Sequence, residues 1–195
     1  MKRLHLLLIL LAFAVPFAAA DTIQLTQNNL GISQTIGSVT LTAQNGGVEV
    51  TLTANSGFAF KMPGGDIAFN TSAGLSAGNI SNVMVGGSAY TGSFDLESSK
   101  NISQFGRLTY DLTGLKVHGI NGATTISFFI SNATLAQLQP YKFAVHFCTA
   151  GTGSVCSNNT GFASNVSTVP EPGTLSLLGT GLAGLAGVFR RRFRS

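Results

Sequence analysis

The chain has 195 residues, with 11 Lys and Arg against 7 Asp and Glu, and a formal net charge of +4. The positive excess lies at the two ends, because residues 21–169 contain five basic and six acidic residues, a formal charge of −1. This middle part has no basic stripe that could neutralise many phosphates, so we expect no nucleic-acid partner. The length allows about one or two domains.

Residues 1–20 predict a secretory signal peptide. Two basic residues open the chain, residues 4–17 are almost entirely apolar, and three alanines that end at Ala20 are typical of a cleavage site. We expect export through the Sec translocon and cutting by signal peptidase between Ala20 and Asp21. An uncut amino-terminal anchor is the alternative, although residues 4–17 are shorter than the roughly 20 residues that a spanning helix needs.

The clearest structural signal is Asn45-Gly46, which lies between two runs of alternating apolar and polar residues. Asn-Gly favours a two-residue type I′ turn between antiparallel strands. A hairpin centred there places six apolar residues on one face and mostly threonines on the other. The expected pairs are Val39 with Leu52, Leu41 with Val50, and Ala43 with Val48.

Later segments repeat the period of two that is typical of strands. The apolar residues that share a face are Ile126, Phe128 and Ile130 in one segment, and Tyr141, Phe143, Val145 and Phe147 in another. Further strands are expected near residues 22–28, 57–62, 80–85, 90–96, 104–112 and 115–119. Residues 132–140 suggest a helical turn that Pro140 ends. Many short alternating strands predict an all-β domain over residues 21–165, an antiparallel β-sandwich or a jelly roll.

One short motif resembles the nucleophile elbow of α/β-hydrolases. Ser76 lies in a G-L-S-A-G sequence, and Asp95 or Asp111 and then His118 or His146 follow in the chain order of such a triad. The elbow needs a strand, a sharp turn and a helix, whereas the residues around Ser76 are turn formers without a helical period. We therefore expect no catalytic serine.

Asp95 and Glu97 are two residues apart, so a strand would present both carboxylates on one face. A glycosidase pair or a weak calcium site would use such carboxylates. Phe94 and Leu96 alternate with them, however, which favours a solvated face over a buried one. The two later histidines have no third donor at metal-ligand spacing and are expected to be strand side chains. We therefore predict no metal site and no catalytic residue.

Cys148 and Cys156 are the only cysteines. In an exported chain, a single pair across a short flexible segment favours one disulfide. A redox role would favour C-x-x-C spacing, and a metal site would need more ligands.

The end of the chain has an unusual order of parts. Pro170, Glu171 and Pro172 precede an apolar stretch at 174–189, and a basic cluster follows it, formed by Arg190, Arg191, Arg192 and Arg194. A helix over this stretch is about 24 Å long, close to the thickness of a hydrocarbon core. The arginines are expected to stay on the cytoplasmic side. A G-x-G-x-x-G match at 179–184 lies inside the stretch and lacks the strand that a dinucleotide site requires, so no cofactor is expected.

This order of parts resembles the PEP-CTERM sorting signal of Gram-negative bacteria, and we assign residues 166–195 to it. The resemblance implies an inner-membrane-anchored precursor, from which an exosortase recognises Pro170-Glu171-Pro172 and removes the helix. It also implies a mature form at the cell surface or in the extracellular matrix, and an association with exopolysaccharide or biofilm. An ordinary anchor that is never cut is the alternative.

The leading functional hypothesis is an exported, non-enzymatic surface or matrix protein. A low-charge β domain with hydroxyl-rich faces suits association with exopolysaccharide. Two alternatives stay open, namely a lectin-like module with a defined sugar pocket, and a polysaccharide-active hydrolase that uses Ser76, Asp95 or Glu97.

Overall fold

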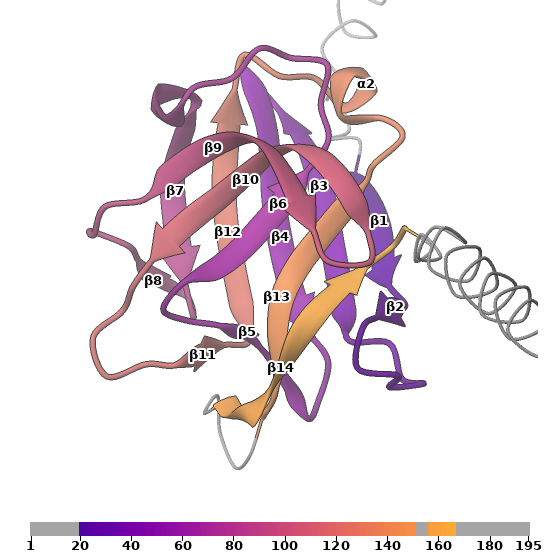
Figure 1. Ribbon diagram of the computed structural model, residues 1–195. Coiled ribbons are helices and arrows are strands. Elements are labelled where there is room, and N and C mark those ends of the chain that lie inside the picture. The colour runs from indigo at the N-terminus through magenta and orange to yellow at the C-terminus, as the bar shows by residue number, and fades with distance from the viewer. Residues whose placement is uncertain (1–19, 151–155, 167–195) are drawn as a thin grey trace, which may run out of the picture.

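The computed structural model describes residues 20–150 and 156–166. The predicted signal peptide before Ala20, the Pro-Glu-Pro motif, the apolar stretch and the terminal arginines lie outside these residues. The described part forms two antiparallel sheets that pack face to face, with the second sheet in front of the first in Figure 1. The predicted all-β class and the antiparallel sandwich are confirmed.

The first sheet has six strands in the order β1-β3-β4-β12-β7-β8. Their bounds are Ala20–Leu25 for β1, Gly37–Gln44 for β3, Gly47–Ala54 for β4, Thr125–Ser131 for β12, Ile80–Val85 for β7 and Ser88–Ala89 for β8. The central strands β3, β4 and β12 alternate between buried and partly exposed residues, which is the pattern of a sheet with one face against a core.

The second sheet has eight strands, and β13 is its centre. The bounds are Gln27–Asn28 for β2, Phe58–Lys61 for β5, Gly65–Phe69 for β6, Asp95–Ile102 for β9, Gly106–Leu115 for β10, Gly122–Ala123 for β11, Phe143–Ala150 for β13 and Cys156–Ser164 for β14. β5 and β6 pair with successive parts of β13, and β14 pairs with it separately. β10 and β9 extend the sheet beyond β6, whereas β2 extends it beyond β14.

The hairpin between β3 and β4 has the register that the sequence predicts. All three expected pairs are present, and five of the six apolar residues are buried, with Ala43 partly exposed. The predicted turn type was wrong. A type I′ turn needs positive φ at both central residues, and Gly46 has a φ of +83° while Asn45 does not have positive φ. The Gly46 carbonyl accepts a hydrogen bond of 2.9 Å from the backbone amide of Asn132, so the segment that follows β12 helps to orient the turn.

Aromatic side chains fill the centre of the core between the sheets. Phe69 has its ring centroid 5.9 Å from that of Phe143 and 6.3 Å from that of Phe128, which joins the two sheets. Such ring pairs contribute about 0.5–1.5 kcal/mol beyond the burial of area. The predicted inward faces of β12 and β13 are confirmed, except that Tyr141 lies in the loop before β13 with a φ of +46°.

The remaining strand predictions were partly right. Residues 80–85 form β7 as expected, and β5 and β10 lie close to their predicted positions. Residues 90–94 and 116–119 are loops, so the strands expected at 90–96 and 115–119 were wrong apart from their overlaps with β9 and β10. The expected helical turn is present as α2, Leu135–Leu138, whose first turn is capped by Thr134.

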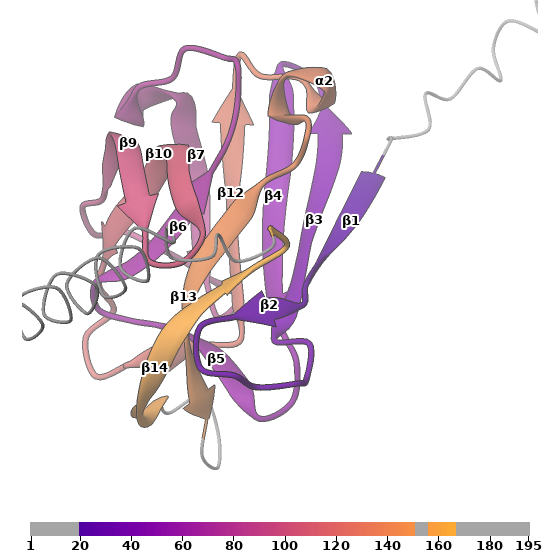
Figure 2. The ribbon, with the colours of Figure 1, turned by 45° about the vertical axis from the view of Figure 1, so that its right-hand side comes forward.

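The β9–β10 hairpin folds over the outer face of the second sheet. Ile102, Phe105 and Leu108 pack there against Ala68 and Ala144, which point away from the main core. Figure 2 shows this hairpin on the side of the molecule opposite to β1 and β3. Small residues at positions 68 and 144 leave space for the hairpin, so this part of the sheet is covered on both faces.

Candidate functional site

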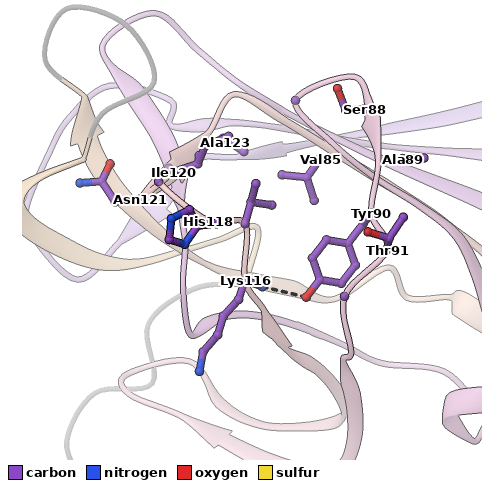
Figure 3. A pocket seen from close by; sticks show the side chains of 15 residues that line it. Val85, Ser88, Ala89, Tyr90, Thr91, Lys116, His118, Ile120, Asn121 and Ala123 are labelled. Carbon is purple, nitrogen blue, oxygen red and sulfur yellow. Dashed lines mark hydrogen bonds between the residues drawn. The ribbon is translucent and has the colours of Figure 1, made fainter.

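A groove of about 650 Å³ lies at one end of the sandwich. One wall is the 86–92 loop, which contains β8, and the other is the 116–121 loop between β10 and β11 (Figure 3). Gly86 and Gly87 have φ values of +59° and +82° and form the two-residue turn between β7 and β8. These signs fit the type I′ turn, for which glycine carries no steric cost.

Tyr90 joins the two walls of this groove. Its hydroxyl accepts a hydrogen bond of 2.9 Å from the backbone amide of Lys116 and donates one of 2.8 Å to the carbonyl of Ser93. Figure 3 shows the Tyr90 ring between the loops and the Lys116 side chain extending away from it. Hydrogen bonds within the protein therefore fix the two walls of the groove relative to each other.

The 116–121 loop is also fixed at its far end. The Asn121 side chain accepts a hydrogen bond of 2.9 Å from the amide of Cys156 and donates one of 3.3 Å to its carbonyl. Cys156 forms a disulfide with Cys148 that links β14 to β13, with a Cα–Cα distance of 5.4 Å. The structure thus contains the predicted disulfide, and Asn121 connects it to the groove.

The groove has a positive and partly apolar lining. Lys116 and His118 are exposed, and none of its described lining residues is acidic. Ile120 is 42% exposed, more than other large hydrophobic side chains of the described residues. Sequence reasoning missed this site because the loop was expected to be a strand.

The residues of the hydrolase-like motif do not form an elbow. Ser76 precedes η1, a 3₁₀ helix of three residues at Ala77–Asn79, and its hydroxyl donates a hydrogen bond of 3.0 Å to the Asn79 side chain. His118 lies in the groove loop, so its expected place in a strand was wrong. His146 lies in β13 as expected and stacks on Phe162 with ring centroids 4.8 Å apart. Burial lowers the pKa of His146.

Asp95 and Glu97 are both exposed on β9, as the solvated-face interpretation predicts. The Glu97 carboxylate accepts a hydrogen bond of 3.0 Å from Lys100 Nζ. The same ammonium lies 3.4 Å from Oδ2 of Asp111, which is fully buried on the neighbouring strand. Among the described residues, no group of three or more His, Cys, Asp and Glu side chains is placed to hold a metal ion.

Asp111 is an ionisable group in an unfavourable place for a charge. Burial is the main reason that its pKa rises to about 6, and the nearby charge of Asp66 adds to the rise while Lys100 opposes it. Neither carboxylate oxygen accepts a well-formed hydrogen bond. The burial of Asp111 could not be predicted from the sequence, because alternation with Tyr110 and Leu112 places Asp111 on an outer, solvated face.

The predicted signal-peptide boundary lies at the start of β1. Ala20 pairs with Thr42 of β3, and the Asp21 carboxylate accepts a hydrogen bond of 2.6 Å from the hydroxyl of Tyr141. That hydrogen bond raises the pKa of Tyr141. Cutting after Ala20 stays a prediction, and it would leave Asp21 as the first residue of the first sheet.

Comparison with known proteins identifies the class of protein through its sorting signal. Residues 168–192 match the family model of the PEP-CTERM protein-sorting motif. The chain thus carries a PEP-CTERM sorting signal, which implies an exported protein that is targeted to an exosortase and has a membrane-anchored precursor. Neither the curated proteins nor the solved structures include a match to the chain.

A membrane-spanning helix was predicted at 174–189, outside the residues that the structure describes. Within residues 20–150 and 156–166, no helix is both long and apolar enough to cross a membrane.

Proposed function

We propose that this protein is a non-enzymatic component of the cell surface or extracellular matrix that associates with exopolysaccharide. The observation that carries the proposal is the position of the sorting motif. Its match begins at residue 168, four residues after β14 ends at Ser164. The β-sandwich is therefore the part of the chain that is exported, and its surface is available to bind other molecules.

The outer face of the first sheet suits weak contact with polysaccharide. Hydroxyl groups gather there, and those of Thr22 and Thr40 lie 3.2 Å apart on neighbouring strands. Phe129 is partly exposed on the same side of β12, and its ring lies over Gly47, where a Cβ would collide with it. Hydroxyls donate and accept hydrogen bonds, and an aromatic ring offers an apolar surface to the C–H face of a sugar.

The placement of the possible catalytic groups supports the non-enzymatic proposal. The Ser76 hydroxyl donates a hydrogen bond to the Asn79 side chain, and Asp111 is fully buried on β10. Asp95 and Glu97 project from an exposed strand, and neither lines the groove. A glycosidase needs its carboxylates on either side of a bound sugar.

Matrix association is tested with the full chain in a host that carries an exosortase. The cells are treated with mild periodate, which oxidises vicinal diols of polysaccharide. The protein that they release is compared with that from untreated cells. We expect release of the processed protein together with carbohydrate. Processed protein that stays in the periplasm, or that is never cell-associated, contradicts the proposal.

The groove favours a second candidate, a lectin-like module. A lectin binds one class of sugar with a saturable isotherm, whereas a weakly adhesive sheet face binds many polysaccharides to a similar extent. A glycan array probed with the processed protein distinguishes the two. Polysaccharide cleavage that is lost in Ser76→Ala or in Asp95→Ala would instead establish an enzyme.

A further inference from the structure

The geometry points to the groove between the 86–92 and 116–121 loops as a binding site for an acidic oligosaccharide. We propose that Lys116 and His118 receive a sugar carboxylate there, and that the apolar part of the lining contacts the sugar rings. This inference rests on the proposed association with polysaccharide, and it adds the place of binding and the charge class of the ligand.

The first support is the pre-formed shape of the groove. Its volume of about 650 Å³ lies within the roughly 300–1,000 Å³ typical of ligand sites. The Tyr90 hydroxyl holds one wall to the other through Lys116, and Asn121 fixes the second wall to Cys156. A site fixed in this way loses little conformational entropy when a ligand enters.

The second support is an available positive charge. The side chain of Lys116 is exposed and forms no ion pair with the described residues, whereas Lys100 is paired with Glu97 and Asp111. His118 lies two residues further along the same loop and is also exposed. Since the described lining contains no carboxylate, a bound anion meets no competing acidic group. A hydrogen bond between an ammonium and a carboxylate is roughly twice as strong as a neutral one.

The third support separates an acidic sugar from a simple anion. Ile120 offers an exposed aliphatic side chain, and the exposed Ala89 and the partly exposed Val117 add to the apolar part of the lining. Ser88 and Thr91 provide hydroxyls on the opposite loop. A hexuronate carries a carboxylate, hydroxyls and an apolar C–H face, so its chemistry matches all three parts of the lining. Inorganic phosphate would use only Lys116 and His118.

The test is calorimetric binding to the exported and processed protein. The probes are trimers to hexamers of galacturonate, glucuronate-containing and mannuronate–guluronate oligosaccharides, each beside its carboxyl-reduced neutral form. We expect at least one acidic set to bind with saturation and its reduced form to bind about tenfold more weakly or not at all. Binding should also weaken between 50 and 300 mM NaCl, about as expected from charge screening.

Matched variants locate the site. Lys116→Gln and His118→Gln should each weaken binding, and Lys116→Gln by about tenfold. Lys142→Gln makes the same change of charge outside the groove lining and should bind as the wild type does. Circular dichroism and melting of each variant check that it is folded.

Three results would overturn this inference. They are no binding to any acidic set, equal binding of the neutral forms, and equal weakening by Lys142→Gln. If any of these results is found while periodate still releases the processed protein, the matrix proposal stands and only the proposed binding site in the groove is rejected. Absence of the processed protein from the cell surface removes the matrix proposal itself.

Discussion

Lys100 Nζ lies 3.4 Å from Oδ2 of Asp111, and the Asp111 side chain is fully shielded from solvent by the fold. The pair joins β9 to β10, and the ammonium also binds Glu97. One partly exposed cation is thus shared between a buried and an exposed carboxylate. Removing a carboxylate from water costs free energy that one shared ion pair does not fully recover, which is why burial dominates the titration of Asp111.

This arrangement predicts an unusual dependence of stability on pH. The pKa of Asp111 is raised from 3.8 to about 6 in the folded protein, so the folded state holds this proton more tightly than the unfolded state does. The protonated Asp111 side chain therefore contributes fully to the stability of the fold below pH 4, and this contribution is lost as the pH rises through 6. The size of the rise corresponds to roughly 1–3 kcal/mol.

Asp111→Asn should remove this contribution. We expect the difference in unfolding free energy between variant and wild type to grow in favour of the variant from pH 4.5 to pH 7.5. Urea denaturation at several pH values measures it. The lowered pKa of His146 acts in the opposite direction in both proteins and cancels in the difference. A difference that does not change with pH would contradict the raised pKa.

Gly46→Val should lower the stability of the β3–β4 hairpin. Gly46 has a φ of +83°, and a Cβ built there meets nothing within 4 Å, so strain and not collision is the cost. A side chain at positive φ costs about 1–2 kcal/mol, and a β-branched one resists it most. Thermal melting measures the loss. Gly74→Val is the control, since Gly74 is exposed and does not have positive φ. Equal melting temperatures for both variants would contradict the role of φ.

The comparison at Gly46 shows what the sequence could and could not predict. Alternation and a two-residue loop determine which residues of β3 and β4 face each other, so the register was predictable. The turn type was not, because the backbone amide of Asn132, which follows β12 and is distant in sequence, binds the Gly46 carbonyl. β14 was missed for a related reason, since its residues are mostly polar or small and its strand character comes from pairing with β13 and β2.

The same reasoning applies to the groove. Residues 115–119 have an alternating pattern, yet the chain leaves the sheet after Leu115. The Lys116 amide donates its hydrogen bond to the Tyr90 hydroxyl, in place of the backbone hydrogen bond to a neighbouring strand that a strand residue would make. Contacts of this kind, between residues 26 positions apart, are not encoded in any local pattern.

Tyr90→Phe should loosen the groove without removing a charged group. The variant loses the acceptor for the Lys116 amide and the donor to Ser93. Leaving a backbone amide unpaired costs about 1–3 kcal/mol where water cannot replace the partner. Hydrogen exchange should show faster exchange at Lys116. Tyr110→Phe is the matched control, because that hydroxyl accepts from the Leu75 amide instead. Unchanged protection of Lys116 in Tyr90→Phe would show that the hydroxyl does not hold the loop.

The disulfide predicts that the exported protein has no free thiol. Alkylation without reductant should leave Cys148 and Cys156 unmodified in mass spectrometry, and reduction should expose both. By the loop-entropy account, the bond contributes roughly 2–3 kcal/mol. Full labelling of native material would contradict the bond. Reduction should also speed exchange at the Cys156 amide, which Asn121 binds.

The last prediction concerns the sorting motif at 168–192. Replacing Pro170, Glu171 and Pro172 with alanines should abolish cutting in a host that carries an exosortase, and should trap a larger, basic form in the membrane fraction. Cutting removes the apolar stretch and the four arginines, each worth about 1 kcal/mol near anionic lipid, and with the signal peptide removed it changes the formal charge from +4 to about −1. Mass spectrometry and fractionation measure both changes. Replacement of Val166 and Ser167 with alanines, just before the matched motif, is the control and should still be cut. If wild type and triple variant accumulate identically as full-length membrane protein, the segment is an anchor and is not processed.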